Sequence, residues 1–144
     1  MKQVSDLLKV KGSQVWSVET DATVREALEL MAEKDVGALL IMRKGEIAGI
    51  FSERDFARSA AKEGSLSLDS PVSQLMTSKV ITVSPSDEID TCMGLMTELH
   101  IRHLPVLDQG EIAGMVSIGD AVKSIIPHQS SFIRQLEDYI SGRW

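Results

Sequence analysis

The eleven residues GEIAGIFSERD, at positions 45–55, return as GEIAGMVSIGD at positions 110–120. Sliding the chain by 65 residues aligns positions 15–58 with 80–123 without a gap, and thirteen of the 44 aligned pairs are identical. Self-similarity at a fixed period indicates copies of one structural unit. We therefore expect a chain built from two related halves.

A second pair of similar segments lies upstream of this repeat. VSDLL at positions 4–8 resembles VSQLM at positions 72–76, but the displacement here is 68 residues. The first copy therefore carries about three extra residues near positions 9–14. With these segments included, most of the chain is accounted for by the duplication.

Both halves show the same pattern of expected elements. In residues 23–34, apolar side chains recur at i, i+3, i+4 and i+7, the spacing of an amphipathic helix. Thr23 and Glu26 form a capping-box pattern at the start of that helix. Two apolar runs then flank a turn at Gly45, and again at Gly110, where glycine suits a hairpin that needs positive φ. First strands are expected over 15–18 and 80–83, and second helices over about 53–62 and about 119–125.

This order predicts a mixed α+β fold of two β-α-β-β-α repeats, related by a pseudo-twofold axis and packed through their sheets. A half-chain of about 60 residues is marginal alone, so the two copies are expected to share one core and to leave two related clefts between them. We place residues 1–66 in the first repeat, 67–127 in the second, and 128–144 in a helical tail. The tail either packs on its own module or forms an interface with another subunit.

Composition and charge narrow the class of protein. The chain has 144 residues and a net charge of −6, which disfavours nucleic acid as a partner because the field repels phosphate. The longest apolar run, at positions 37–42, is too short to span a bilayer, and the N-terminal residues do not form a secretory signal. Cys92 is alone, so an intramolecular disulfide and a cysteine-cluster metal site are excluded. A cytoplasmic protein without a membrane or nucleic-acid partner is expected.

Two G-h-h-S-x-x-D segments, where h is apolar, carry a family resemblance: GIFSERD at 49–55 and GMVSIGD at 114–120. Together with IRHLPVLDQGEIAGMVS and VSQLMTSKVITVSPSD, they make the chain similar to tandem CBS domains, the Bateman module. The resemblance covers roughly positions 4–126. It implies a regulatory module that binds an adenosine-containing ligand between the repeats: AMP, ADP, ATP, an NAD-type dinucleotide or S-adenosylmethionine. It also implies a homodimer.

The resemblance further implies a set of nucleotide-binding residues. Asp55 and Asp120 would accept hydrogen bonds from ribose hydroxyls, with Ser52 and Ser117 beside them. This agrees with the chemistry, since an ionised carboxylate is acceptor-only and a cis-diol offers two donors. Adenine-edge and phosphate candidates complete the set: Val15, Trp16, Ser17, Arg54, Lys79, Val80, Ile81, Thr82, Arg102, His103 and Pro105.

Each of these assignments has a plainer alternative. S-x-x-D is also a helix capping box, so Ser52 and Asp55 could satisfy backbone N–H groups, and the two roles are compatible. Trp16 could pack in the core, and the arginines could be solvated surface residues. Because Arg54 corresponds to Gly119, and the basic groups are unequally distributed, the two clefts should differ. We expect the cleft of Asp120 to bind more tightly.

Three functions compete. The leading one is a sensor of adenine nucleotides or dinucleotides that signals in trans to an unidentified regulated protein. The alternative is a structural dimerisation module with no physiological ligand. An enzyme is disfavoured, because no catalytic residues, catalytic cofactor or metal ligands can be assigned: Cys92 lies on an apolar helix stripe, and no carboxylate–histidine cluster is evident.

Overall fold

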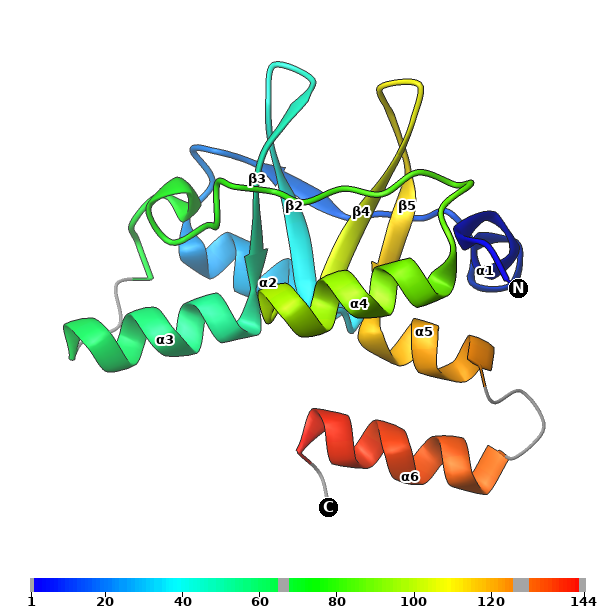
Figure 1. The fold of residues 1–144 in the computed structure, drawn as a ribbon. Coiled ribbons are helices and arrows are strands. Elements are labelled where there is room, and N and C mark those ends of the chain that lie inside the picture. Colours follow the sequence, from blue (N-terminus) through cyan, green and yellow to red (C-terminus); the bar gives the residue numbers. More distant parts are fainter. Residues whose placement is uncertain (1, 65–67, 126–129, 143–144) are drawn as a thin grey trace. The chain divides into compact units, whose positions relative to one another are not determined.

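The computed structural model describes residues 2–64, 68–125 and 130–142, which form two compact units. One unit is Val15–Val80, and the other combines Met1–Gln14 with Ile81–Trp144. The helices and strands are shown in Figure 1. In chain order they are α1 (Val4–Lys11), β1 (Ser17–Glu19), α2 (Val24–Lys34), β2 (Ala38–Arg43), β3 (Glu46–Ser52), α3 (Glu53–Glu63), the 3₁₀ turn η1 (Val72–Gln74), α4 (Ile89–Leu99), β4 (His103–Asp108), β5 (Glu111–Ser117), α5 (Ile118–Ile125) and α6 (Ser130–Ser141).

The unit Val15–Val80 contains a three-stranded sheet in the order β1-β2-β3. β1 runs parallel to β2, and β2 pairs antiparallel with β3. The strand pairing is extended by the N–H of Leu40, which donates to the carbonyl of Trp16 at 3.1 Å, and by the N–H of Thr20, which donates to Met42 at 3.1 Å. The core of this unit is apolar: Val24, Ala27, Met31, Leu39, Ile41, Phe51 and Val72.

The other unit keeps β4 and β5 as an antiparallel pair, but the expected strand over 80–83 is reduced to a single bridge between Val83 and Val106. The counterparts of Leu40 and Thr20 in this copy are Pro105 and Pro85. Proline has no N–H, so both of the bonds that extend the strand in the first copy are lost. The prediction of a strand there was wrong, although the mixed α+β order is otherwise confirmed.

Both hairpins have the expected turn. The central residues Lys44 and Gly45 have φ of 51° and 80°, and Gln109 and Gly110 have φ of 51° and 82°. Positive φ at both central positions defines a type I′ turn, whose twist matches the twist of the flanking strands. The glycine prediction is therefore confirmed in each copy.

The similar segments VSDLL and VSQLM, at positions 4–8 and 72–76, each pack in the unit formed mainly by the other repeat. α1 lies in the unit that holds β4 and β5, where the N–H of Ile89 donates to the carbonyl of Lys2 at 3.0 Å. The segment around η1 does the same for α2, since the N–H of Val24 donates to Ser70 at 2.9 Å. The N-terminal segment, placed with the first repeat from its position in the chain, thus makes its contacts in the unit of the second.

Close backbone packing explains the second glycine of GEIAG. A Cβ added at Gly49 would lie 2.5 Å from Sδ of Met76 and 2.8 Å from the carbonyl oxygen of Thr77. At Gly114, a Cβ would lie 2.6 Å from Cδ2 of Leu8. Each glycine therefore leaves room for a segment that packs against its strand: the residues around Met76 and Thr77 at Gly49, and α1 at Gly114. We call these two stretches the crossing segments.

The ends of the helices follow ordinary capping chemistry. Thr23 accepts a hydrogen bond from the N–H of Glu26 at 3.1 Å, and the Glu26 carboxylate accepts one from the N–H of Thr23 at 3.0 Å. The capping box predicted for α2 is confirmed. The expected tail helix is α6, which contacts α5, and Lys123 lies 3.4 Å from Glu137 across that contact. Among the helices described, none has the length and apolar character required to cross a lipid bilayer.

Gly94 offers a simple test of the helical assignment of α4. It is exposed in the interior of the helix, and a Cβ there would meet nothing within 4 Å. We expect Gly94→Ala to raise the free energy of unfolding by about 0.5–1 kcal/mol, because alanine loses less backbone entropy in a helix. Urea denaturation measures the change, and a loss of stability would contradict the exposed, helical position of Gly94.

Candidate functional site

The carboxylate of Asp55 lies in the first turn of α3, directly after β3. Ser52 is the N-cap of this helix: its N–H donates to Oδ2 of Asp55 at 2.8 Å, and the N–H of Asp55 donates to Oγ of Ser52 at 3.2 Å. The hydroxyl groups of Ser52 and Thr77 donate to Oδ2 and Oδ1 of Asp55, at 3.0 and 3.2 Å. The half-buried carboxylate is therefore held by neutral donors.

Asp120 has the same place after β5, in the first turn of α5. The N–H of Ser117 donates to Oδ2 of Asp120 at 3.0 Å, and the N–H of Asp120 donates to Oγ of Ser117 at 3.1 Å. The capping interpretation is thus correct for both copies. It leaves the ligand role open, because a carboxylate has about four lone-pair positions and the cap uses only part of them.

A lysine distinguishes the second aspartate from the first. Lys11, the last residue of α1, places its Nζ 2.5 Å from Oδ2 of Asp120 and 2.8 Å from the carbonyl oxygen of Met115. The side chains of Lys11 and Asp120 are only 32% and 22% exposed, so water screens this ion pair incompletely. The second carboxylate is therefore neutralised by a cation from the chain itself.

These contacts also shift the titration of Asp120. Burial alone would raise its pKa, but the hydrogen bond from Lys11, the N–H of Ser117 and the charge of the lysine outweigh burial. The pKa of Asp120 consequently lies below the ordinary value for an aspartate.

Thr77 and Lys11 make equivalent contacts in the two units. The N–H of Thr77 donates to the carbonyl of Ile50 at 2.8 Å, and its hydroxyl reaches Asp55. The ammonium of Lys11 reaches the corresponding carbonyl of Met115 and the corresponding carboxylate. In each unit, one residue therefore bonds both the strand carbonyl and the motif carboxylate. Thr77 does so through its neutral N–H and O–H groups, and Lys11 does so through its charged ammonium.

Several predicted residues gather around Ser117. His103 is its partner in the β4–β5 register, and Pro105 lies opposite Met115. The carbonyl of Arg102 accepts the N–H of Ile118 at 3.0 Å, while the Arg102 guanidinium donates to the carbonyl of Ile140 in α6 at 3.3 Å. Strand pairing therefore brings these candidates together beside Asp120.

Other candidates are less closely grouped. Trp16 packs partly buried against the core of its unit, and Nζ of Lys34 lies 4.4 Å from the centre of its ring, which favours the packing interpretation. Arg54 lies in the first turn of α3, Ser17 is the first residue of β1, and Val15 precedes that strand by two residues. The adenine-edge segment is divided between the units: Lys79 and Val80 fall in one, and Ile81 and Thr82 in the other.

The two residues that sequence reasoning missed are Lys11 and Thr77. Neither belongs to the S-x-x-D motif, and the bonded partners are 109 and 22 positions apart in the chain. The similarity of VSDLL to VSQLM was the available signal. It identified the crossing segments but not the unit in which each packs.

Two features of the described residues bear on metal binding and on the reactivity of the cysteine. Among these residues, no cluster of three histidine, cysteine or acidic side chains could hold a metal ion. Cys92 is fully buried in α4, and burial, with a smaller contribution from the charge of Asp87, raises the pKa of its thiol. The reactive thiolate is therefore disfavoured.

Comparison with known proteins gives consistent matches along the chain. A family model described as CBS domain matches residues 4–62 and 72–127. The mitochondrial CBS domain-containing protein CBSX3 of Arabidopsis thaliana is 38% identical over 149 residues, which covers 96% of this chain and 72% of that protein.

Solved structures agree with this match. A putative signal-transduction protein with CBS domains from Burkholderia ambifaria MC40-6 superposes with a TM-score of 0.84 and 45% identity, over 89% of this chain and 96% of that chain. The CBS domain protein PAE2072 from Pyrobaculum aerophilum, complexed with AMP, superposes with a TM-score of 0.72 and 30% identity, over 83% of this chain and 89% of that chain.

Proposed function

The chain belongs to the CBS-domain family and carries two copies of the domain, and from this we propose that it is a regulatory module for adenosine-containing ligands. The ligand class is AMP, ATP or an NAD-type dinucleotide, bound through its ribose. The module acts in trans on a regulated protein and as a homodimer, without catalysis of its own. A position of the ligand between the repeats, and a location in the cytoplasm, belong to the same proposal.

The observation that carries this proposal is the matched placement of Asp55 and Asp120. Each stands in the first turn of a helix directly after a strand, oriented by a serine cap. An oriented carboxylate can accept both hydroxyls of a ribose, and the helix N-terminus nearby favours an anion such as phosphate. A structural neighbour with 30% identity carries AMP, which supports the same ligand class.

Thermal denaturation with added ligand tests the proposal directly. A ligand that binds only the folded state stabilises it by about 2.7 kcal/mol at a hundred times its dissociation constant. We expect AMP, ATP or NAD to raise the Tm of the protein at about millimolar concentration, and S-adenosylmethionine is tested as the fourth ligand. Mass spectrometry of small molecules released from the heat-denatured protein would identify a ligand retained in purification. No stabilisation by any of the four would favour the alternative, a structural dimerisation module.

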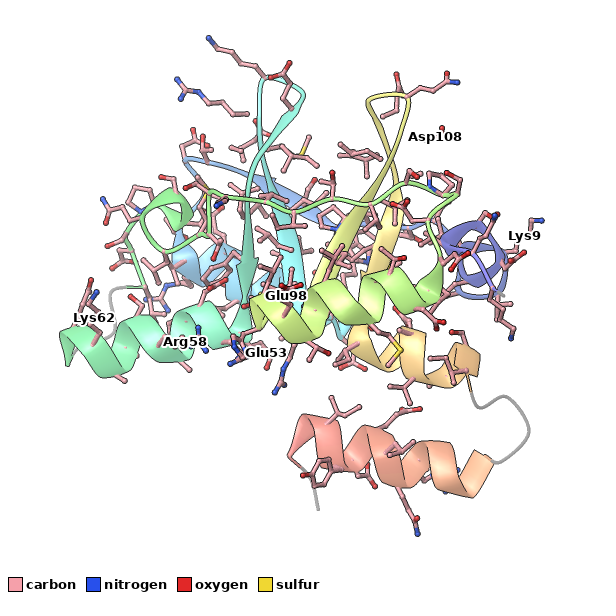
Figure 2. All side chains as sticks on the ribbon, viewed as in Figure 1. Lys9, Glu53, Arg58, Lys62, Glu98 and Asp108 are labelled. Carbon is pink, nitrogen blue, oxygen red and sulfur yellow. The ribbon has the colours of Figure 1, made fainter. Side chains whose placement is uncertain are left out.

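Removal of either motif carboxylate is expected to weaken nucleotide binding at its own site at least tenfold. In Asp55→Ala and Asp120→Ala the ribose hydroxyls lose their acceptor, and a tenfold loss corresponds to about 1.4 kcal/mol. Isothermal titration calorimetry measures the change. Asp108→Ala is the matched control, since Asp108 lies at the hairpin end of β4, at the opposite end from Ser117 (Figure 2). Unchanged affinity in both test variants would refute the ribose assignment.

A further inference from the structure

The ammonium of Lys11 occupies the carboxylate that the proposed ligand requires. We propose that Lys11 acts as an internal competitor for ribose at Asp120, so that Asp55 takes ligand first and binding at Asp120 detaches the end of α1. This inference rests on the proposed function and adds an order to its two sites. It reverses the expectation from sequence that the site of Asp120 binds more tightly.

The competition follows from the lone pairs of the carboxylate. Oδ2 of Asp120 accepts hydrogen bonds from the N–H of Ser117 at 3.0 Å and from Nζ of Lys11 at 2.5 Å. An oxygen of a carboxylate accepts about two such bonds, so Oδ2 is fully used. A cis-diol that bonds both oxygens must therefore displace either the cap or the lysine. The cap is part of the helix, so the lysine is the group that leaves.

Asp55 presents a smaller obstacle. Apart from the N–H of Ser52, its carboxylate is bonded by the hydroxyl groups of Ser52 and Thr77, at 3.0 and 3.2 Å. A hydroxyl can rotate away or act as an acceptor itself, and it carries no charge, whereas Lys11 is held at Asp120 by the attraction of opposite charges as well as by a hydrogen bond. Displacement of Lys11, by contrast, also breaks its bond to the carbonyl of Met115. The free-energy cost of freeing the carboxylate for the ligand is therefore smaller at Asp55 than at Asp120.

Displacement of Lys11 has a structural result. Lys11 is the last residue of α1, and its two bonds link that end of the helix to β5 and α5. A ligand bound at Asp120 stabilises the arrangement in which these bonds are absent. Because binding and attachment of α1 exclude each other, the ligand shifts α1 between an attached and a released state.

A single-site titration isolates the competition. Asp55→Asn removes the other motif carboxylate and keeps a side-chain oxygen for the cap of α3. In this background, Lys11→Met is compared with Lys9→Met, which removes an exposed lysine two residues earlier on the outer side of α1 (Figure 2). Adenosine is the probe, because a neutral ligand has no phosphate that a lysine could attract. Circular dichroism confirms that each variant is folded.

We expect Lys11→Met to bind adenosine about 1.5-fold to fivefold more tightly than its parent, the range that a partly exposed ion pair provides. Lys9→Met should equal the parent. Salt weakens the ion pair, so the affinity of the parent should rise with ionic strength while that of Lys11→Met stays constant. Hydrogen exchange of the amides of α1 should increase when adenosine binds the parent.

Three results would overturn the inference. Equal or weaker adenosine binding by Lys11→Met than by its parent would show that Lys11 does not compete with ribose. An equal gain in affinity in Lys9→Met would show that the effect depends on net charge and not on the contact with Asp120. In both cases adenosine still binds, so the proposed function stands. If adenosine binds none of the variants, including Lys11→Met, the carboxylate of Asp120 does not take ribose and the inference falls. The proposed function falls with it only if the unsubstituted protein, which keeps Asp55, also fails to bind adenosine.

Discussion

Gly49→Ala is expected to lower the free energy of unfolding by about 2–3 kcal/mol, whereas Gly114→Ala should cost about 1 kcal/mol or less. The two glycines occupy the same position of an identical pentapeptide. At Gly49 the new methyl group would meet the carbonyl oxygen of Thr77 at 2.8 Å as well as the side chain of Met76. That carbonyl accepts the N–H of Ile50 at 2.9 Å, so the backbone cannot move without losing the bond.

The environment of Gly114 is more adaptable. The atoms closest to a Cβ there, at 2.6, 3.2 and 3.5 Å, all belong to the side chain of Leu8. A leucine can change rotamer at a modest cost, whereas a paired backbone carbonyl cannot. Urea denaturation of the two variants, each compared with the parent protein, measures the difference. Equal costs would show that the carbonyl of Thr77 does not restrict this position.

The second large effect concerns Asp120. Asp120→Asn is expected to lower the free energy of unfolding at neutral pH by about 1–2 kcal/mol, because it removes the charge that bonds Lys11 and weakens the cap of α5. The folded-state pKa of Asp120 lies below its ordinary value. A depressed pKa means that the stabilisation is fully present above the unfolded-state pKa of about 3.9. It is lost as the pH falls through the lower folded-state pKa.

Denaturation at several pH values therefore provides the test. The difference between the parent and Asp120→Asn should be constant from pH 7 to about pH 5 and should shrink in stronger acid. Asp108→Asn, at the exposed hairpin end of β4, is measured at the same pH values as the control. Lys11→Met should remove most of the same acid-sensitive component. A difference that persists unchanged into strong acid would mean that the charge of Asp120 does not contribute.

Much of the local structure could be predicted because local rules determine it. The amphipathic spacing of residues 24–31 and the capping pair Thr23 and Glu26 specified α2. Gly45 and Gly110 specified the hairpins because their turns require positive φ. The duplicated pentapeptide then allowed each assignment to be made twice. These features depend on neighbours within a few residues, which a sequence displays directly.

The remaining features depend on partners that are distant in the chain. Pro105 abolishes a strand only because its counterpart, Leu40, is the residue that donates to the neighbouring strand, and this requires the register. Lys11 belongs to the site only because α1 packs in the unit of β5. No local pattern connects Lys11 with Asp120. The motif aspartates were therefore predictable, and the cation paired with one of them was not.

The crosswise packing of α1 also determines when each unit can be completed during synthesis. Residues 15–80 form one unit that is contiguous in the chain, whereas Lys11 must wait until Asp120, 109 residues later, has been made. Contacts between such distant residues form slowly, because a long loop must close first. The first of the described helices, α1, is therefore among the last to pack, and until then the apolar face carrying Val4 and Leu7 is available to chaperones.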